Sequence, residues 1–248
     1  MTMLDPLEHT QPVPERVYNR ILEYINGDHD TDRLPPETAL AEQLRVSRTA
    51  VREALQRLEV EGYVVRKRKV GTCIVARNPA VHAGFEVLNS ITKIIENAGM
   101  SPGTSFLEYK LKPADSFIRE KLQLQAGDEV SVLKRVRTAD DIPVWYDTGF
   151  MPTRYLGEDD VERLGHSLMV YLSKVKGVDV VEALTSFHPY SADKVIAERL
   201  GVPEGHLLML LEQTLSDANR VPIVYSRSFY RSDVIGFHIV RKARGIWR

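Results

Sequence analysis

The stretch VSRTAVREALQRLEVEGYVVRKRKVGT, residues 46–72, decides how the first third of this 248-residue chain folds. It opens with Ser47, a residue type that favours the N-cap of a helix, and continues with apolar side chains at helical spacing. It ends in four consecutive basic residues, Arg66 to Lys69, followed by Val70, Gly71 and Thr72. A basic run is most often a solvated face, so the flanking sequence must show whether this one has a function.

Three helices are predicted in this part of the chain. Residues 14–26 carry apolar side chains at offsets of four, seven and eight, Pro36 suits the first turn of a second helix, and Ser47 opens a third. Two short helices joined by a tight turn are typical of a helix-turn-helix. The predicted buried stripes are Val17, Ile21, Tyr24 and Ile25, then Leu40, Ala41 and Leu44, then Val51, Ala54, Leu55 and Leu58.

The third predicted helix also has a polar face. Arg48, Arg52 and Gln56 recur every four residues opposite the apolar stripe, and Thr49 lies beside them. The N-terminal half of this helix enters the major groove in a helix-turn-helix, where arginine can bind guanine O6 and N7 with paired hydrogen bonds. The alternative is a solvated helix face with ordinary charges.

The basic run lies between two β-rich segments, GYVVRK and GTCIVA, which predicts a hairpin with the run at its tip. The 33 basic and 34 acidic residues of the whole chain nearly cancel, but residues 45–77 hold nine basic and three acidic ones, a local net charge of +6. Such a segment has the electrostatic character that phosphate backbones attract. Helices followed by this hairpin predict a winged helix whose wing lies along DNA.

Residues 14–76 resemble the DNA-binding domain of GntR-family bacterial transcription regulators, through RLPPETALAEQLRVSRTAVREALQRLEVEGYV. The resemblance implies DNA contacts by the third helix and close backbone approach at the wing glycine. Thr38 stands where the family usually has an arginine, Arg45 where it has a glycine, and Lys69 and Val70 replace a glycine-rich wing tip. The predicted DNA-binding residues are Thr38, Arg45, Ser47, Arg48, Thr49, Arg52, Arg68, Lys69 and Gly71.

The rest of the chain alternates strands and helices joined by short turns, which predicts an antiparallel α+β domain. The predicted organisation is a winged helix at 12–76, a linker at 77–83 and a second domain at 84–242. The predicted helices are 90–98, 115–124, 167–175 and 191–200. The predicted strands are 106–113, two within 129–152 around a turn at 139–143, one at 179–188, and a final pair within 207–230 joined near 217–220.

An anion site is predicted in the second domain from strand geometry. Arg135 and Arg137 are two apart and point to the same face of their strand, which suits a buried face only if an anion pairs with them. A wet face, or acidic neighbours, would be the structural alternative. Asn89 with Ser90, and separately Ser167, begin predicted helices whose free amides favour anions, although an N-cap serine without a ligand is commoner.

Residues 84–240 resemble the UTRA effector-binding domain of the HutC subfamily, which shares the fold of chorismate lyase, through LKRVRTADDIPVWYDTGFMP, SLMVYL and VPIVYSRSFYRSD. In relatives that bind phosphosugars, the matching positions surround the phosphate and the sugar. Asp147 and Val224 stand where glutamate is usual, so anion capture is expected to be kept and sugar recognition altered. The predicted effector-binding residues are Asn89, Ser90, Arg135, Arg137, Asp147, Ser167, Val224 and Tyr230.

These patterns predict a DNA-binding transcription regulator, with repression the favoured outcome. The predicted partners are a palindromic operator in double-stranded DNA, a second copy of the chain, and a small phosphorylated or carboxylated metabolite. The single Cys73 and the lack of a long apolar run predict a cytoplasmic protein with no membrane contact, metal or cofactor. The alternatives are a ligand-independent dimeric repressor and, less favoured because the seven histidines are scattered singly, an enzyme of chorismate lyase-like fold.

Overall fold

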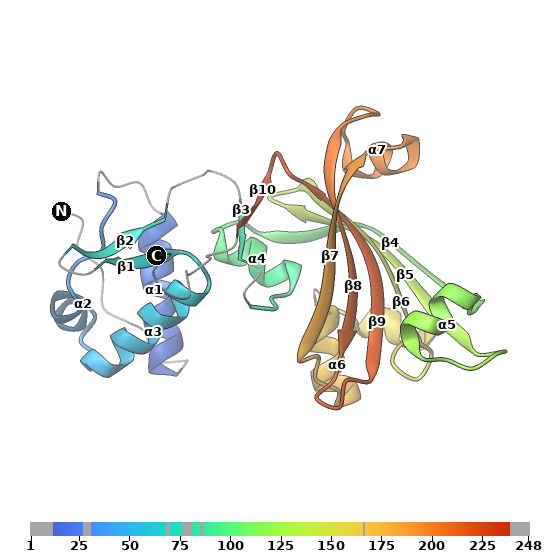
Figure 1. Cartoon of the computed structure of the whole chain (residues 1–248), viewed down its shortest axis with the longest axis horizontal. Coiled ribbons are helices and arrows are strands. Elements are labelled where there is room, and N and C mark those ends of the chain that lie inside the picture. Colours follow the sequence, from blue (N-terminus) through green and yellow to red (C-terminus); the bar gives the residue numbers. More distant parts are fainter. Residues whose placement is uncertain are drawn as a thin grey trace, which may run out of the picture. The chain divides into compact units, whose positions relative to one another are not determined.

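The computed structural model describes residues 12–26, 31–67, 70–75, 81–84, 87–165 and 167–238. The chain divides into two compact units (Figure 1). The first contains the residues up to 87, together with 97–99 and 236 onward, and the second contains residues 88–96 and 100–235. Each unit has its own hydrophobic core.

The predicted winged helix is confirmed in the first unit. Its elements among the described residues are α1 (Val13–Asn26), α2 (Glu37–Leu44), α3 (Arg48–Val60), and the hairpin of β1 (Val64–Lys67) and β2 (Gly71–Ile74). All the predicted stripe residues are buried in one cluster except Tyr24, which is partly buried against it. Val64 and Ile74 of the hairpin join the same cluster, so the wing is anchored in the helical core.

The ends of the helices follow from local chemistry. Ser47 caps α3, since its Oγ accepts a hydrogen bond from the Ala50 amide at 3.2 Å. Pro36 lies immediately before α2 and not in its first turn. Arg45 ends α2 in a left-handed conformation with φ 53°, a position that glycine usually fills because other residues are strained there.

A buried carboxylate links α1 to α3 through hydrogen bonds. Glu61, at the end of α3, accepts a hydrogen bond from Arg57 Nε at 2.8 Å and another from the Tyr18 hydroxyl of α1. The Arg57 guanidinium lies 4.1 Å from the centre of the Tyr18 ring. Burial and the adjacent carboxylate raise the pKa of Tyr18, so its hydroxyl stays a donor to Glu61. This cluster fixes the orientation of α3.

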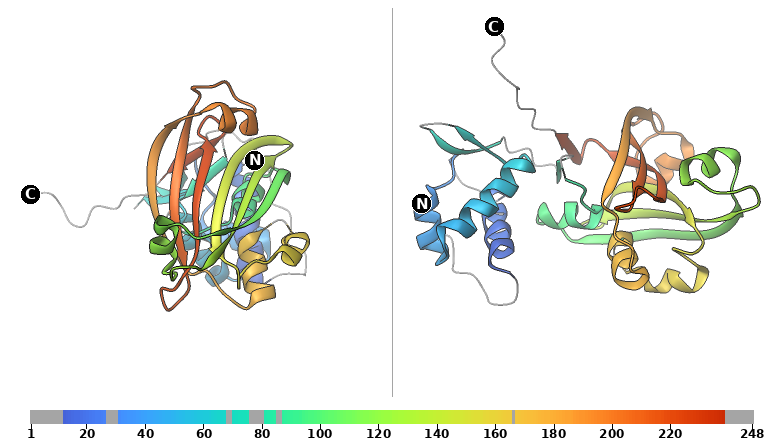
Figure 2. Two further views of the ribbon diagram at one scale, coloured as in Figure 1. Left: turned by 90° about the vertical axis from the view of Figure 1, so that its right-hand side faces the viewer. Right: turned by 60° about the horizontal axis from the view of Figure 1, so that its bottom comes forward.

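The second unit is built on a six-stranded antiparallel sheet with the strand order β4-β5-β6-β9-β8-β7 (Figures 1 and 2). Its strands are β4 (Pro102–Pro113), β5 (Glu129–Ala139), β6 (Ile142–Pro152), β7 (Glu182–Ser191), β8 (Leu207–Ser216) and β9 (Pro222–Arg231). The helices are α4 (Ile91–Asn97), α5 (Ser116–Leu122), η1 (Glu158–Arg163), α6 (Leu168–Lys176) and α7 (Lys194–Leu200). The predicted α+β class with an antiparallel sheet is confirmed.

The two faces of the sheet are covered by different helices. On one face, α6 packs on Leu133, Met151 and Val224. On the other face, α5 packs against Val130 and Val132, while α7 packs farther along the same strands. Because residues two apart share a face, Arg135 and Arg137 lie on the α6 side, beyond the apolar cluster. The candidate effector residues that belong to β5, β6 and β9 therefore lie on this face.

Three elements were missed by the sequence patterns. Residues 81–84, most of which were predicted to be linker, form strand β3 (Val81–Gly84), which pairs with β10 (Ile235–His238). The 3₁₀ helix η1 was not predicted either. Four-residue strands have too little local periodicity to be recognised, and the partner of β3 lies about 150 residues away.

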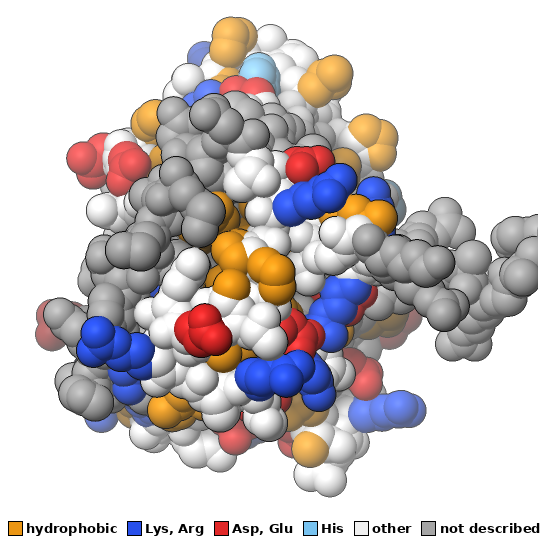
Figure 3. All heavy atoms as spheres, turned by 90° about the vertical axis from the view of Figure 1, so that its left-hand side faces the viewer, with side chains coloured by type: hydrophobic (Ala, Val, Ile, Leu, Met, Phe, Trp, Pro, Cys, Tyr) orange, Lys and Arg blue, Asp and Glu red, His pale blue; other side chains and the backbone are white. Residues whose placement is uncertain are grey.

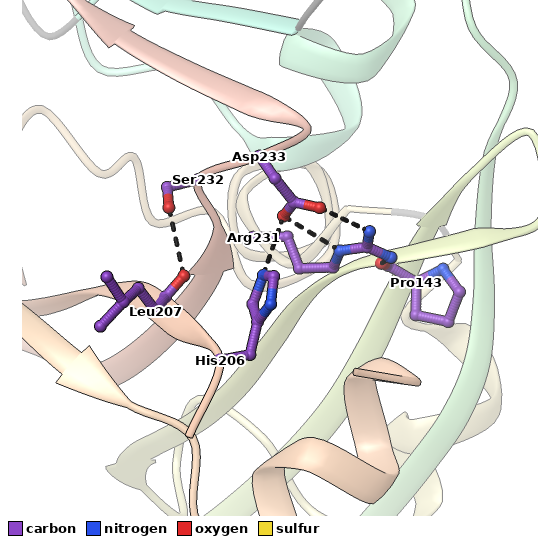
Figure 4. A network of polar contacts seen from close by, with 6 residues as sticks. All are labelled: Pro143, His206, Leu207, Arg231, Ser232 and Asp233. Carbon is purple, nitrogen blue, oxygen red and sulfur yellow. Dashed lines mark hydrogen bonds and ion pairs between the residues drawn. The ribbon is translucent and has the colours of Figure 1, made fainter. Parts of the chain in front are cut away.

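A charged network joins the end of β9 to neighbouring strands (Figure 4). Arg231 Nη2 lies 2.7 Å from Asp233 Oδ2, and its Nη1 donates to the Pro143 carbonyl at 3.4 Å. His206 Nε2 lies 3.3 Å from Asp233 Oδ1. The hydrogen bond from Arg231 holds the pKa of Asp233 at about 2, so this carboxylate is ionised at neutral pH. The network fixes the corner where the chain leaves the sheet.

Candidate DNA interface and effector site

Four of the predicted DNA-binding residues lie together in the first unit. Thr38, Arg45, Ser47 and Arg48 line one shallow concave surface at the turn between α2 and α3. Thr49 lies on a neighbouring concave surface that also includes the start of α1. Basic and acidic side chains are interspersed on the face of the molecule shown in Figure 3. The turn and the start of α3 thus form one exposed surface with both hydroxyl and guanidinium donors.

Arg52 is held by a carboxylate that sequence reasoning missed. Its Nε and Nη2 both donate to Glu37 Oε2, at 3.3 and 3.2 Å. Arg66 of β1 approaches the other oxygen of Glu37 at 3.8 Å and donates to the Arg52 carbonyl at 3.2 Å. Arg66 Nε also lies 3.7 Å from Glu59 Oε2. We call these four residues, Glu37, Arg52, Glu59 and Arg66, the recognition-helix network.

The wing is described only in part. Gly71 has φ +107°, which L side chains rarely adopt, and a Cβ built there would meet no atom within 4 Å. Its backbone is therefore exposed, and the close approach to DNA that the resemblance implies at this glycine stays a prediction. Arg68 and Lys69, both predicted to contact DNA, lie outside the described residues.

The candidate effector site is centred on one row of side chains across three strands. Arg135, Asp147 and Ser228 are direct cross-strand neighbours on β5, β6 and β9. Arg135 Nη2 lies 3.9 Å from Asp147 Oδ2, and the Ser228 hydroxyl donates to Asp147 Oδ1 at 2.7 Å. All three are buried. An acidic neighbour, which was the structural alternative to an anion site, is thus present beside Arg135, but at ion-pair and not hydrogen-bond distance.

Arg137 is more firmly bound by the protein than Arg135. It is fully buried, its Nε donates to the Gly103 carbonyl of β4 at 2.8 Å, and its Nη2 donates to Thr92 Oγ1 of α4 at 3.1 Å. Burial and the nearby positive charge of Arg135 lower the pKa of Arg137 to about 10, so it stays protonated at neutral pH. Arg137 therefore ties β4 and α4 to the site.

Two aromatic residues complete this cluster. Trp145 pairs in register with both Arg137 and Tyr230, and the Trp145 and Tyr230 rings lie 6.0 Å apart. The Arg135 guanidinium carbon lies 5.5 Å from the Trp145 ring centre. The indole N–H of Trp145 interacts with the Tyr230 hydroxyl, whereas the buried Arg135 Nε has no hydrogen-bond partner within the described residues. One charged donor of the site therefore has no acceptor there.

The charge of this site depends on Asp147. Burial raises the pKa of Asp147 to about 6, although Arg135 and Ser228 both favour its ionised form. Burial and the Asp147 charge also raise the pKa of Tyr230, so its hydroxyl stays neutral. With Asp147 ionised, its carboxylate and the two guanidiniums together carry a net charge of +1 in a buried site. Protonation of Asp147 raises this net charge to +2.

Both units match known families. Residues 14–74 match the family described as bacterial regulatory proteins, gntR family, and residues 97–235 match the UTRA domain. The chain belongs to the GntR family of transcription regulators that carry a UTRA domain. The HTH-type transcriptional repressor NagR of Bacillus subtilis (strain 168) is 27% identical to this GntR regulator, over 90% of this chain and 92% of NagR. The repressor PhnF of Mycolicibacterium smegmatis is 29% identical over 89% and 88%.

Solved structures agree with this assignment. The crystal structure of PhnF from Mycobacterium smegmatis has a TM-score of 0.60 at 27% identity, covering 92% of this GntR regulator and all of that chain. YydK from Bacillus subtilis, at 19% identity and a TM-score of 0.68, shares the fold over 94% of this chain. The family consists of transcription regulators, so this protein is not an enzyme. No helix in the described ranges is long and apolar enough to cross a membrane.

Four predicted effector residues of this GntR regulator are not joined to the arginine cluster by any described contact. Val224 is buried with Leu133 and Met151 beneath α6, and the register places it two rows of that face away from Asp147. Ser90 accepts a hydrogen bond from the Lys93 amide, and Ser167 accepts one from Val170, so both serve as helix caps. Half-buried Asn89 precedes Ser90.

Trp145 was missed from the predicted site of the GntR regulator, although a signal was present. It lies two residues before Asp147 in the same strand, so the alternation that places Asp147 on a face also places Trp145 there. Its contact with Arg135 depends on strand pairing, which the sequence does not give. Within the described residues, no group of three or more His, Cys, Asp or Glu side chains is placed to hold a metal ion.

Proposed function

We propose that this regulator is a repressor whose affinity for a palindromic operator is changed by a small anionic metabolite bound among Arg135, Trp145 and Tyr230. The observation that carries the proposal is the buried Arg135 guanidinium, whose Nε has no acceptor within the described residues and whose ion pair with Asp147 is 3.9 Å long. The relatives NagR and PhnF are both named as repressors, which supports the direction of control.

The energetic cost of burying the arginine charges in this site favours an anionic ligand. Burial of a charged donor without a hydrogen-bond partner is strongly unfavourable, and two guanidiniums here have one carboxylate between them. A phosphate or carboxylate oxygen would accept from Arg135 and neutralise the excess charge. Arg137 contributes positive charge to the site. Its hydrogen bonds to Gly103 and Thr92 occupy part of its guanidinium, so it has fewer donors than Arg135 for direct contact with the ligand. The Trp145 and Tyr230 rings provide an apolar wall for the rest of the molecule.

The DNA-binding form is proposed to be a homodimer. Two recognition helices would enter major grooves of half-sites about one helical turn apart or less. The strand β7 supports a second copy, since it is the last strand in the sheet order of the described residues and Leu184 and Phe187 on it are 74% and 43% exposed. The effector can change operator affinity only by binding the two arrangements of the dimer with different affinity, typically by about 1–3 kcal/mol.

The test combines DNA binding with a fluorescent reporter. The chain has two tryptophans, Trp145 and Trp247, so Trp247→Phe leaves the indole in the proposed site as the only one. Sugar phosphates, glycerol 3-phosphate and dicarboxylates are titrated while Trp145 emission is recorded, and the active compounds are then added to footprints on the selected operator. A ligand that shifts emission and weakens the footprint supports the proposal.

Two variants decide whether the ligand acts at this site. Arg135→Ala should abolish the emission change, whereas Lys134→Ala, on the opposite face of the same strand, should keep it. Equal binding by Arg135→Ala would overturn the proposed site. A footprint on a palindrome that no anion in the panel alters would favour a ligand-independent dimeric repressor instead.

A further inference from the structure

The contacts of Glu37 within the recognition-helix network point to a role for this residue that goes beyond the proposed function. We infer that Glu37 is a positioning residue for DNA sequence recognition, which holds the Arg52 guanidinium so that one defined edge faces a base. This inference rests on the proposed base contact of Arg52. The contacts among four charged side chains from α2, α3 and β1 support the positioning role of Glu37.

The hydrogen bonds to Glu37 use one edge of the Arg52 guanidinium. Nε and one N–H of Nη2 both donate to Glu37 Oε2, at 3.3 and 3.2 Å. A guanidinium has five N–H donors in a planar fork, so Nη1 and the second N–H of Nη2 remain. That end edge carries the parallel pair of donors that fits guanine O6 and N7. Glu37 therefore binds the side of Arg52 that base recognition does not need.

The network does not contribute much to folding. The Arg52 side chain is 59% exposed and that of Glu37 is 26% exposed, and ion pairs in such positions add little to stability. What the pair does restrict is the freedom of a long side chain. An arginine already held in its bound orientation loses less conformational freedom when it meets DNA, which raises both affinity and selectivity.

Arg66 extends the network to the wing. Its Nη2 donates to the Arg52 carbonyl, and its guanidinium lies within 4 Å of both Glu37 and Glu59. The start of the wing is thereby attached to the backbone of α3 at the residue that is proposed to read a base. Two carboxylates balance two guanidiniums, so the network is neutral as a whole. When DNA replaces water around the Arg52 guanidinium, Glu37 can keep its ion pair with Arg66.

The experiment is a double-mutant cycle on DNA selectivity with the full chain. An operator is first selected from a random duplex pool, and every single-base variant of one half-site is then measured in competition. Arg52→Ala should lose discrimination at its base position by about tenfold or more. Glu37→Gln keeps the size of the side chain but removes its charge, and it should lose a large part of the same discrimination at the same position only.

Two further variants separate positioning from general effects. In the Arg52→Ala background, Glu37→Gln should cause no additional loss of selectivity. Glu23→Gln, at a 63% exposed position of α1 that lines neither concave surface, also removes one negative charge and should leave base choice unchanged. Glu37→Gln should in addition raise affinity for random-sequence duplex slightly, because a repelling charge near DNA is removed. Thermal unfolding checks that every variant is folded.

The outcomes distinguish this inference from the proposed function. If Arg52→Ala loses base choice while Glu37→Gln keeps it as Glu23→Gln does, Glu37 does not position Arg52, and the DNA-binding function stands. If Arg52→Ala keeps full base choice at every position, the proposed base contact fails, and the inference fails with it. Loss at the same base in both single variants, without further loss in the double variant, supports it.

Discussion

Arginines in the two units of this regulator work under opposite physical conditions. Arg52 of α3 is 59% exposed and pairs with Glu37 in contact with water, whereas Arg137 of β5 is fully buried and bonded to Gly103 and Thr92. An exposed ion pair adds little to stability and is easily exchanged, which suits a surface that must bind DNA. A buried guanidinium is costly unless its bonds persist, so it becomes part of the core. The same residue type is therefore proposed to serve specificity in one unit, while it belongs to the core in the other.

The largest predicted effect contrasts these two arginines directly. Arg137→Ala leaves a cavity and two acceptors without a donor, and it should lower the free energy of unfolding by roughly 3 kcal/mol or more. Arg52→Ala should lower it by less than about 1 kcal/mol while weakening DNA binding. Urea unfolding followed by circular dichroism measures both. Equal destabilisation by the two changes would show that burial does not separate their roles.

A second prediction concerns the pH dependence of the buried site. The pKa of Asp147 is raised from 3.8 to about 6 in the folded protein, so the folded state binds its proton more tightly than the unfolded state. The resulting stabilisation is fully present below about pH 4 and is lost as pH rises through 6. Against Asp147→Asn, the wild type should lose up to about 3 kcal/mol of unfolding free energy across this range.

The same titration should appear in anion binding. Protonation of Asp147 removes the negative charge beside Arg135, so the site should bind sulfate, whose charge is constant here, more tightly as pH falls through 6. Asp147→Asn should bind with little pH dependence. Sulfate affinity measured by calorimetry at pH 5 to 8 checks this, and a wild-type profile as flat as that of the variant would refute the assignment.

A smaller effect on stability is expected at two helix ends, one in each unit. At each of them the residue that ends the helix has a left-handed backbone conformation, which is strained for any residue other than glycine. Arg45 ends α2 and Gln123 ends α5, with φ values of 53° and 54°, although glycine is favoured in that conformation. Arg45→Gly and Gln123→Gly should each raise the free energy of unfolding by about 0.5–1 kcal/mol. If only Arg45→Gly weakens DNA binding, the difference assigns Arg45 to the interface. Thermal unfolding and a DNA titration of both variants provide the comparison.

The smallest predicted change in stability belongs to the recognition-helix network. Glu37→Gln should change the free energy of unfolding by less than about 1 kcal/mol, and the difference should shrink as salt rises from 0.05 to 0.5 M because exposed pairs are screened. Chemical unfolding at several salt concentrations tests this. A loss of 2 kcal/mol or more would mean that Glu37 is a core residue and that its effect on DNA selectivity is indirect.

The predictable parts of the fold are those with local signals. The apolar stripes and the Ser47 cap placed α1, α2 and α3 within a residue or two, and turn residues separated the strands of the second unit. Pairs of short strands such as β3 and β10 gave no such signal, because their stability comes from a partner far away in the chain. The Arg135–Asp147 pair was partly predictable, since alternation gives the face but not the neighbouring strand.

The sequence by itself determined that the chain has a winged helix, an antiparallel α+β domain and paired arginines on one face of a strand, because caps, periodicity and charge are properties of short segments. Only the tertiary structure decided which groups meet across strands and helices. It paired Arg52 with Glu37, brought Trp145 to Arg135, and placed Val224 with the apolar residues beneath α6. Strand register and helix packing depend on the whole core, so distances between residues far apart in sequence are set only when the core forms.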